Sequence, residues 1–95
     1  MPAEAQPNAP VPLPITGELD LHTFQPGDLG ELIPAYLDEC AARGLREVRI
    51  VHGKGTGTLR RAVREMLSKH ALVRAHASAP PRAGGDGVTV AELAT

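Results

Sequence analysis

The sequence predicts an α/β fold, a two-layer sandwich of order β-α-β-α-β-β with a mixed four-stranded sheet. Three observations lead to this prediction. The spacing of apolar residues changes along the chain between a period of two and a period near 3.6. A β-branched segment runs straight into a glycine-rich loop that opens a helix, and two strands joined by a helix should be parallel. The 95 residues fit one domain, so we expect a disordered proline-rich tail over residues 1–17 and a folded domain over 18–95.

The first strand is expected at residues 18–22, Glu-Leu-Asp-Leu-His. Strict alternation there turns Leu19 and Leu21 toward a core and leaves Asp20 and His22 on the opposite side. The polar pair therefore projects from one face of the sheet, near the end of its strand.

Two helices are expected, one on each side of the second strand. Apolar residues at helical spacing follow Asp28, and Gly44 stands where a C-terminal cap is usual. Pro34 interrupts this first pattern, so the helix is either kinked there or begins near it. The second helix covers residues 59–70, with Thr58 as its N-cap.

The last third of the chain predicts two strands around a turn-rich loop. Residues 72–77 alternate, with Val73 on one side and His76 on the other. Residues 80–87 are rich in proline and glycine and form a loop, and residues 88–93 form the closing strand.

The most informative segment is the second strand with its loop. Val-Arg-Ile-Val at residues 48–51 leads into His52 and then into residues 53–57, which have glycine at every second position. Such a loop before a helix directs free backbone N–H groups and a helix N-terminus at one point, where a phosphate is well held. The alternative is a tight turn in which Lys54 is only a solvated charge. The candidates for phosphate or nucleic-acid contact are Gly53, Lys54, Gly55, Gly57, Thr58, Arg60 and Arg61.

The charge distribution favours an anionic partner. The net charge is −1, but all ten Lys and Arg lie between Arg43 and Arg82, where only Glu47 and Glu65 oppose them, which gives that segment +8. Residues 1–42 carry seven acids and no base. A basic segment of this kind suits a polyphosphate such as nucleic acid, although solvated helix and strand faces would give the same composition.

Composition also excludes several classes of function. Phe24 and Tyr36 are the only aromatic residues, so base-stacking platforms are absent. Cys40 is the only cysteine, which rules out an internal disulfide and fits a reducing compartment. No apolar run reaches membrane-spanning length and no signal peptide is visible. We therefore expect a cytoplasmic monomer with no membrane contact.

Together these segments resemble the small MutS-related (Smr) domain, in its stand-alone single-domain form. The resemblance is carried by Leu-Asp-Leu-His at residues 19–22, by residues 48–60 with His-Gly-Lys-Gly, and by residues 84–89. It implies a fold like the C-terminal domain of a translation initiation factor and an endonuclease activity toward DNA or RNA. Thr23 stands where the family usually has glycine. The residues to which the resemblance assigns cleavage and binding are Asp20, His22, His52, Gly53, Lys54 and Gly55.

Residue chemistry gives the same roles a physical basis. Histidine, with an ordinary pKa near 6.5, suits acid and base catalysis of phosphodiester cleavage, so His22 and His52 are the candidate acid and base and Asp20 would orient one of them. We expect the His52 ring to bend over the strand end to reach them. RNA offers its 2′-hydroxyl as nucleophile, so no cofactor is required, whereas cleavage of DNA would use Mg²⁺ or Mn²⁺. No metal-ligating residues are assigned.

Two other functions remain open. The domain would act as an adaptor if it bound nucleic acid or a ribosome without cutting. Alternatively, the acidic first half and the basic second half would pair between copies and make a self-association module. Binding and nicking assays on the same hairpins distinguish the three hypotheses.

Overall fold

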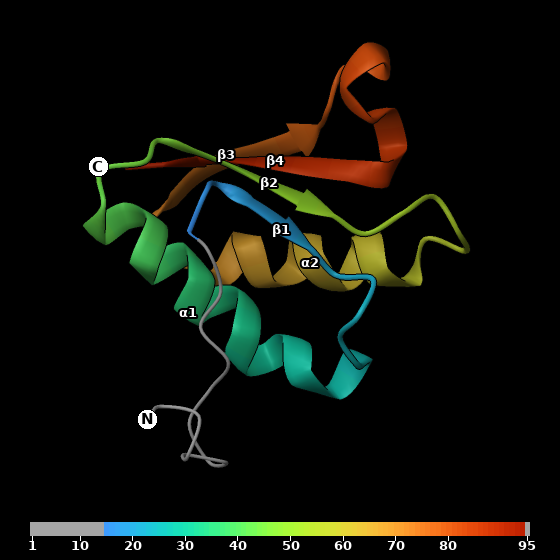
Figure 1. The fold of residues 1–95 in the computed structure, drawn as a ribbon, viewed down its shortest axis with the longest axis horizontal. Coiled ribbons are helices and arrows are strands. Elements are labelled where there is room, and N and C mark those ends of the chain that lie inside the picture. Colours follow the sequence, from blue (N-terminus) through green and yellow to red (C-terminus); the bar gives the residue numbers. More distant parts are fainter. Residues whose placement is uncertain (1–14, 95) are drawn as a thin grey trace, which may run out of the picture.

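The structure, a computed structural model, describes residues 15–94 and has the predicted architecture. Its sheet has the strand order β1-β2-β4-β3, with β1 parallel to β2 and the other pairs antiparallel. Both helices lie on one face of this sheet (Figure 1). The expected two-layer, mixed four-stranded α/β fold is therefore confirmed. The elements are β1 (Glu18–Asp20), η2 (Pro26–Asp28), α1 (Leu29–Ala42), β2 (Glu47–Val51), α2 (Thr58–Lys69), β3 (Val73–Ser78), η3 (Pro81–Ala83), η4 (Gly85–Gly87) and β4 (Val88–Leu93).

The core lies between the sheet and the two helices. Each layer contributes fully buried side chains to this core. They are Val48 and Ile50 of β2, Ile33 of α1, and Val63 and Leu67 of α2. These positions follow the period of two in the strand and the helical spacing in α1 and α2, so each element presents its apolar side to the same layer. None of the helices in residues 15–94 combines the length and the hydropathy needed to cross a membrane.

The first residues of α1 and α2 differ from the alternatives that the sequence pattern favoured. α1 begins at Leu29, directly after η2, and contains Pro34, so it does not begin near the proline. Five buried apolar side chains of α1 hold it to the core, and burial of this size outweighs the roughly 3 kcal/mol that an interior proline costs. The N-cap of α2 is Gly57, at a left-handed φ of +88°, and not Thr58, which is the first helical residue. A positive φ favours glycine, which explains the one-residue shift.

The predicted alternation in the third strand is wrong after its first residue. Val73 pairs with Leu93, but Ala75 pairs with Glu92, so the register shifts between them as in a β-bulge. His76 therefore lies on the same side as Val73, where its Nε2 is 3.2 Å from Ser68 Oγ of α2. A β-bulge inserts one extra residue into the strand, and the alternation of residue types in the sequence does not reveal it.

The predicted tail falls mostly on residues 1–14, which lie outside the described part. Ile15 packs against the core, and the Gly17 N–H donates to the Tyr36 hydroxyl at 3.2 Å. Arg49 N–H donates to Gly17 O at 2.7 Å, which extends the β1–β2 pairing by one step.

Candidate functional site

The carboxyl ends of β1 and β2 meet at one edge of the sheet. Asp20 is opposite Val51 in the parallel register, and Leu21 N–H donates to Val51 O at 2.9 Å. His22 follows Leu21 and His52 follows Val51 in the chain. Both histidines therefore stand where their strands leave the sheet at this edge, as expected from the parallel crossover. Below, this margin is called the β1–β2 edge.

Asp20 and His22 form an exposed pair at this edge. Asp20 Oδ1 accepts from the His22 backbone N–H at 2.9 Å and from His22 Nδ1 at 2.7 Å. The side chains are 59% and 70% exposed, respectively. The backbone hydrogen bond first, and then the imidazole, lower the pKa of Asp20 below its ordinary value. Because a carboxylate only accepts, Nδ1 carries the proton in this pair, and in the neutral ring Nε2 is then the nitrogen with the free lone pair.

His52 lies on the inner side of the same edge and is 7% exposed. Its Nδ1 is 2.9 Å from Gly53 O and its Nε2 is 2.8 Å from Thr89 Oγ1. A carbonyl only accepts, so Nδ1 donates to it, and the neutral ring accepts at Nε2 from the Thr89 hydroxyl. The expected bend of His52 toward Asp20 and His22 is wrong, because the ring keeps the inward direction of Val48 and Ile50 and is bonded at both nitrogens.

The glycine loop is fixed at its start by a segment far away in sequence. Gly87 O, in η4, accepts from the backbone N–H groups of His52 at 3.0 Å and Gly53 at 2.9 Å. A Cβ on Gly87 would lie 3.3 Å from Lys54 Cγ, so the two segments touch closely. Gly53 has a φ of +83°, which lets the chain turn away at this point. The contribution of residues 85–87 to the site was not predicted from the sequence, although their glycines were noted.

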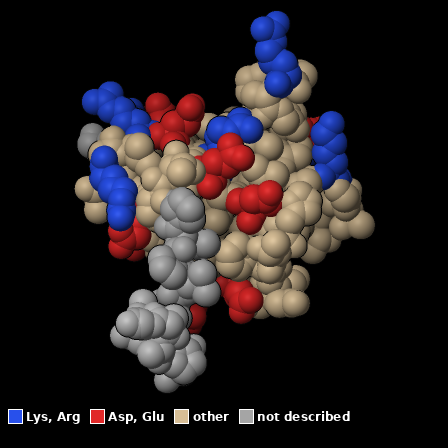
Figure 2. Space-filling model, viewed as in Figure 1, with Lys and Arg blue, Asp and Glu red and all other residues tan. Residues whose placement is uncertain are grey.

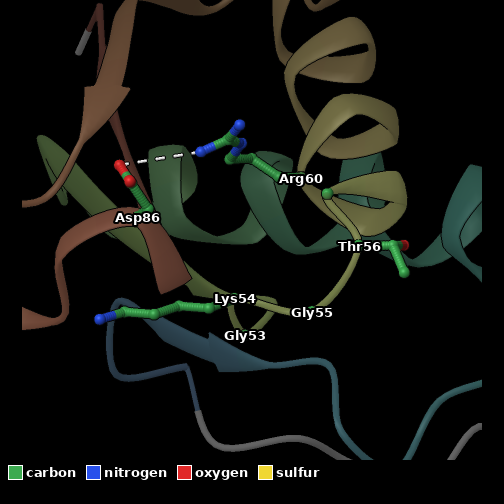
Figure 3. Close-up of a pocket in the computed structure, with 7 residues that line it drawn as sticks. Gly53, Lys54, Gly55, Thr56, Arg60 and Asp86 are labelled. Atoms are coloured by element: carbon green, nitrogen blue, oxygen red, sulfur yellow. Dashed lines mark ion pairs between the residues drawn. The ribbon is translucent and has the colours of Figure 1, made fainter.

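Beyond this anchor the loop keeps its backbone donors free. Within residues 15–94, the N–H groups of residues 54–57 donate to no protein acceptor. They border an open hollow of about 280 Å³, called the loop hollow below. Figure 3 shows the Arg60 and Asp86 side chains pointing toward one another across it, and Lys54 extending from the loop. Arg60 Nη1 is 3.7 Å from Asp86 Oδ1. The loop hollow is lined by Gly53, Lys54, Gly55, Thr56, Gly57, Arg60 and Asp86.

The structure brings most predicted site residues together and leaves one pair apart. Thr58 lines a smaller pocket with His52 and Arg60, and Arg61 lines a cleft beside the loop hollow. Asp20 and His22 lie at the same edge of the sheet, but no hydrogen bond or ion pair joins them to residues 53–57 among the residues described. Within the same range, no three His, Cys, Asp or Glu side chains are grouped as a metal would need.

The basic segment is divided over the surface. Arg43 pairs with Glu39 and Arg49 with Glu18. Figure 2 accordingly shows basic and acidic side chains interspersed on the face it presents. The net charge of +8 in the sequence thus overstates the basic surface, because acidic side chains from outside this segment pair with some of its arginines.

Comparisons with known proteins agree on one domain family. The family model "Smr domain" matches residues 19–94. The chain is 41% identical over 93 residues to Endonuclease MutS2 of Thermus thermophilus, covering 95% of this chain and 12% of that protein. It is 43% identical over 76 residues to Endonuclease MutS2 of Symbiobacterium thermophilum, covering 80% of this chain and 10% of that protein. The chain thus spans about a tenth of the length of these curated relatives.

Two solved structures share the fold. The Smr domain of Thermus thermophilus MutS2 superposes with a TM-score of 0.77 at 42% identity, over 82% of this chain and 98% of that one. YdaL, a stand-alone small MutS-related protein from Escherichia coli, superposes with a TM-score of 0.72 at 27% identity, over 86% of this chain and 67% of that one.

Proposed function

This chain belongs to the Smr domain family, and from that membership we propose that it binds the phosphate backbone of nucleic acid at the loop hollow and cleaves it. The relatives named Endonuclease MutS2 support the reaction class. One observation carries the proposal: at the β1–β2 edge, an exposed Asp20–His22 pair and a loop with unused N–H donors leave the sheet side by side.

Phosphate binding is assigned to the loop. The free N–H groups of residues 54–57, the positive end of α2 and the Lys54 ammonium all offer positive charge to an anion in the loop hollow. Arg60 adds a planar guanidinium at the far side. Because these donors are fixed before the substrate arrives, they would also stabilise the extra charge that develops on the phosphate in the transition state.

Acid and base chemistry is assigned to His22. With Nδ1 held by Asp20, the free Nε2 can take a proton from the attacking oxygen, as in other carboxylate–imidazole pairs. We propose RNA as the substrate, since its 2′-hydroxyl supplies that oxygen without a metal. The 2′-oxygen would bond to phosphorus as the P–O5′ bond breaks, and the departing 5′-oxygen would take a proton from water, which gives a 2′,3′-cyclic phosphate and a 5′-hydroxyl. His52 would have to break two hydrogen bonds to act as a second acid or base, so we propose it as a positioning residue that holds the loop.

Binding without cleavage is the second candidate, and one observation favours it. His22 is the only exposed histidine in residues 15–94, so the two-imidazole arrangement expected from the sequence is not assembled. The exposed Thr23 follows it directly, where the family usually has glycine. An adaptor would keep the loop hollow and lose the reaction.

A paired assay separates these functions. Electrophoretic shifts and cleavage are measured on the same RNA and DNA hairpins, with and without a chelator, for the native chain, His22→Ala, Lys54→Ala and the control Lys69→Ala. We expect His22→Ala to bind normally but to cleave RNA at least about a hundredfold more slowly. Lys54→Ala should weaken binding and Lys69→Ala should not. Native protein that binds but never cuts would establish the adaptor, and chelator-sensitive cleavage without cyclic phosphate ends would refute the RNA mechanism.

A further inference from the structure

We propose that a second phosphate site adjoins the loop hollow, in a cleft at the start of α2, so that the chain holds two consecutive phosphates of one strand. This inference rests on the proposed function, because it concerns the same interface. It adds Arg64 and a second space beside the loop to that interface, and it defines the smallest ligand that fills the interface.

All the charged side chains that line the cleft beside the loop hollow are basic. It measures about 290 Å³, similar in size to the hollow itself, and no acidic side chain lines it, whereas Asp86 lines the loop hollow. Arginine guanidinium groups match the oxygens of a phosphate in geometry and charge. The lining residues are Thr56, Gly57, Arg60, Arg61 and Arg64.

Arg64 is positioned in advance at this cleft. Its Nη2 donates to Ser78 Oγ of β3 at 2.6 Å, and its Nε is buried, so the guanidinium is held between α2 and the sheet. A side chain fixed in this way loses little conformational freedom when it binds a ligand. Arg61 is exposed and makes no ion pair within residues 15–94, which leaves it free to close on the same anion.

Arg60 lines both spaces and therefore links them. Arg60 and Arg64 are four residues apart on α2, so they lie on one side of the helix, about 6 Å apart along its axis. A nucleic-acid strand places neighbouring phosphates at a comparable spacing. The two sites thus suit successive phosphates of one strand.

The chemistry of the two spaces also defines what is recognised. No aromatic side chain lines either of them, so bases have no surface on which to stack. Guanidinium, ammonium and backbone N–H groups contact phosphate oxygens, which position a strand but carry no sequence information. The ligand class is accordingly a sequence-tolerant backbone segment with at least two phosphates.

The test compares oligonucleotides with one and with two phosphates. Binding of a 2′-deoxyuridine dinucleotide and a 2′-deoxyuridine trinucleotide without terminal phosphates, which lack the hydroxyl needed for the proposed cleavage, is followed by NMR titration for the native chain, Arg61→Gln, Arg64→Gln, Lys54→Gln and Lys69→Gln. We expect the native chain to bind the trinucleotide at least about threefold more tightly. Arg61→Gln and Arg64→Gln should each reduce this advantage and lower the salt slope for the trinucleotide by about 0.7. Lys54→Gln should weaken both ligands, and Lys69→Gln, at the other end of α2, neither.

Each result decides a separate point. If Lys54→Gln weakens binding but Arg61→Gln leaves the trinucleotide advantage and the salt slope unchanged, the second site is wrong and the proposed function stands. If the native chain binds neither oligonucleotide, the proposed function fails and the second site with it. The Arg61 side chain is exposed and makes no hydrogen bond or ion pair in the described part of the chain, and its backbone N–H bond to Gly57 O does not depend on the side chain. The Arg61→Gln variant should therefore fold normally, and the test does not depend on Arg64→Gln.

Discussion

The Arg60–Asp86 ion pair should limit the affinity of the loop hollow for phosphate. The two side chains are 38% and 70% exposed and their charged atoms are 3.7 Å apart. A phosphate in the hollow would meet the same guanidinium and would be repelled by the carboxylate. Two unit charges about 4 Å apart interact by about 1 kcal/mol in water, which corresponds to roughly a fivefold change in a dissociation constant. Asp86→Asn, which removes the charge and keeps the shape, should therefore tighten binding by about two- to fivefold.

Fluorescence anisotropy with a labelled RNA strand measures this effect at low and high salt. The gain should vanish near 1 M salt, where the Debye length falls to about 3 Å. Glu31→Gln is the matched control, because Glu31 is exposed on α1 and its replacement changes the net charge equally. Weaker binding by Asp86→Asn would show that Asp86 orients Arg60 for the phosphate. An equal gain in Glu31→Gln would show that only the overall charge matters. Either result refutes the reasoning.

Three further predictions concern the support of the site. Gly87→Ala would place a Cβ 3.3 Å from Cγ of Lys54 in the loop and should weaken RNA binding several-fold. The control Gly30→Ala, whose Cβ would meet open space on α1, should leave RNA binding unchanged. In urea titrations it should raise the free energy of unfolding by about 1 kcal/mol. Thr89→Val leaves His52 Nε2 without its partner and should lower that free energy by about 1–3 kcal/mol; an unchanged urea midpoint would contradict the bond. Asp20 should titrate by NMR below its ordinary value of 3.8, so its contribution to stability is present above that value and lost as the pH falls through the lowered pKa.

The order of the helices and strands was predictable because it follows from local patterns, whereas several bounds differ from the prediction: β1 ends at Asp20 and not at residue 22, and α2 and β3 are each displaced by one residue. Burial on one side imposes a period of two on strands and of about 3.6 on helices, and the sequence records both. β4 runs from Val88 to Leu93, as predicted. Once β1, α1 and β2 are identified, the handedness of crossovers places His22 and His52 at one edge without further information. This part of the site is a consequence of topology.

The contacts that complete the site were not predictable in the same way. His52 bonds to Thr89, 37 residues later, and this contact depends on the antiparallel pairing of Ile50 with Thr89. The approach of Asp86 to Arg60 requires the same register, together with the η4 turn before β4. Alternation alone turns His52 inward with Val48 and Ile50, so the error was the expected bend. The Thr89 partner that holds the ring there could not be deduced, because no local periodicity records which polar side chains will meet across a sheet.

In the sequence the glycine loop is one continuous motif, but its geometry depends on three segments: the end of β2, η4 and the start of α2. Gly87 O takes the N–H groups of His52 and Gly53 at the start of the loop, and Gly57 in a left-handed conformation begins α2 at its end. Within residues 15–94, the N–H groups between these two fixed points donate to no protein acceptor and are free for a ligand. Donors held in this way need no reorganisation when an anion arrives, which is the condition under which backbone dipoles stabilise charge most strongly. A substitution that releases either end should therefore weaken phosphate binding without removing a single charge, a consequence that distinguishes a shaped site from a merely basic surface.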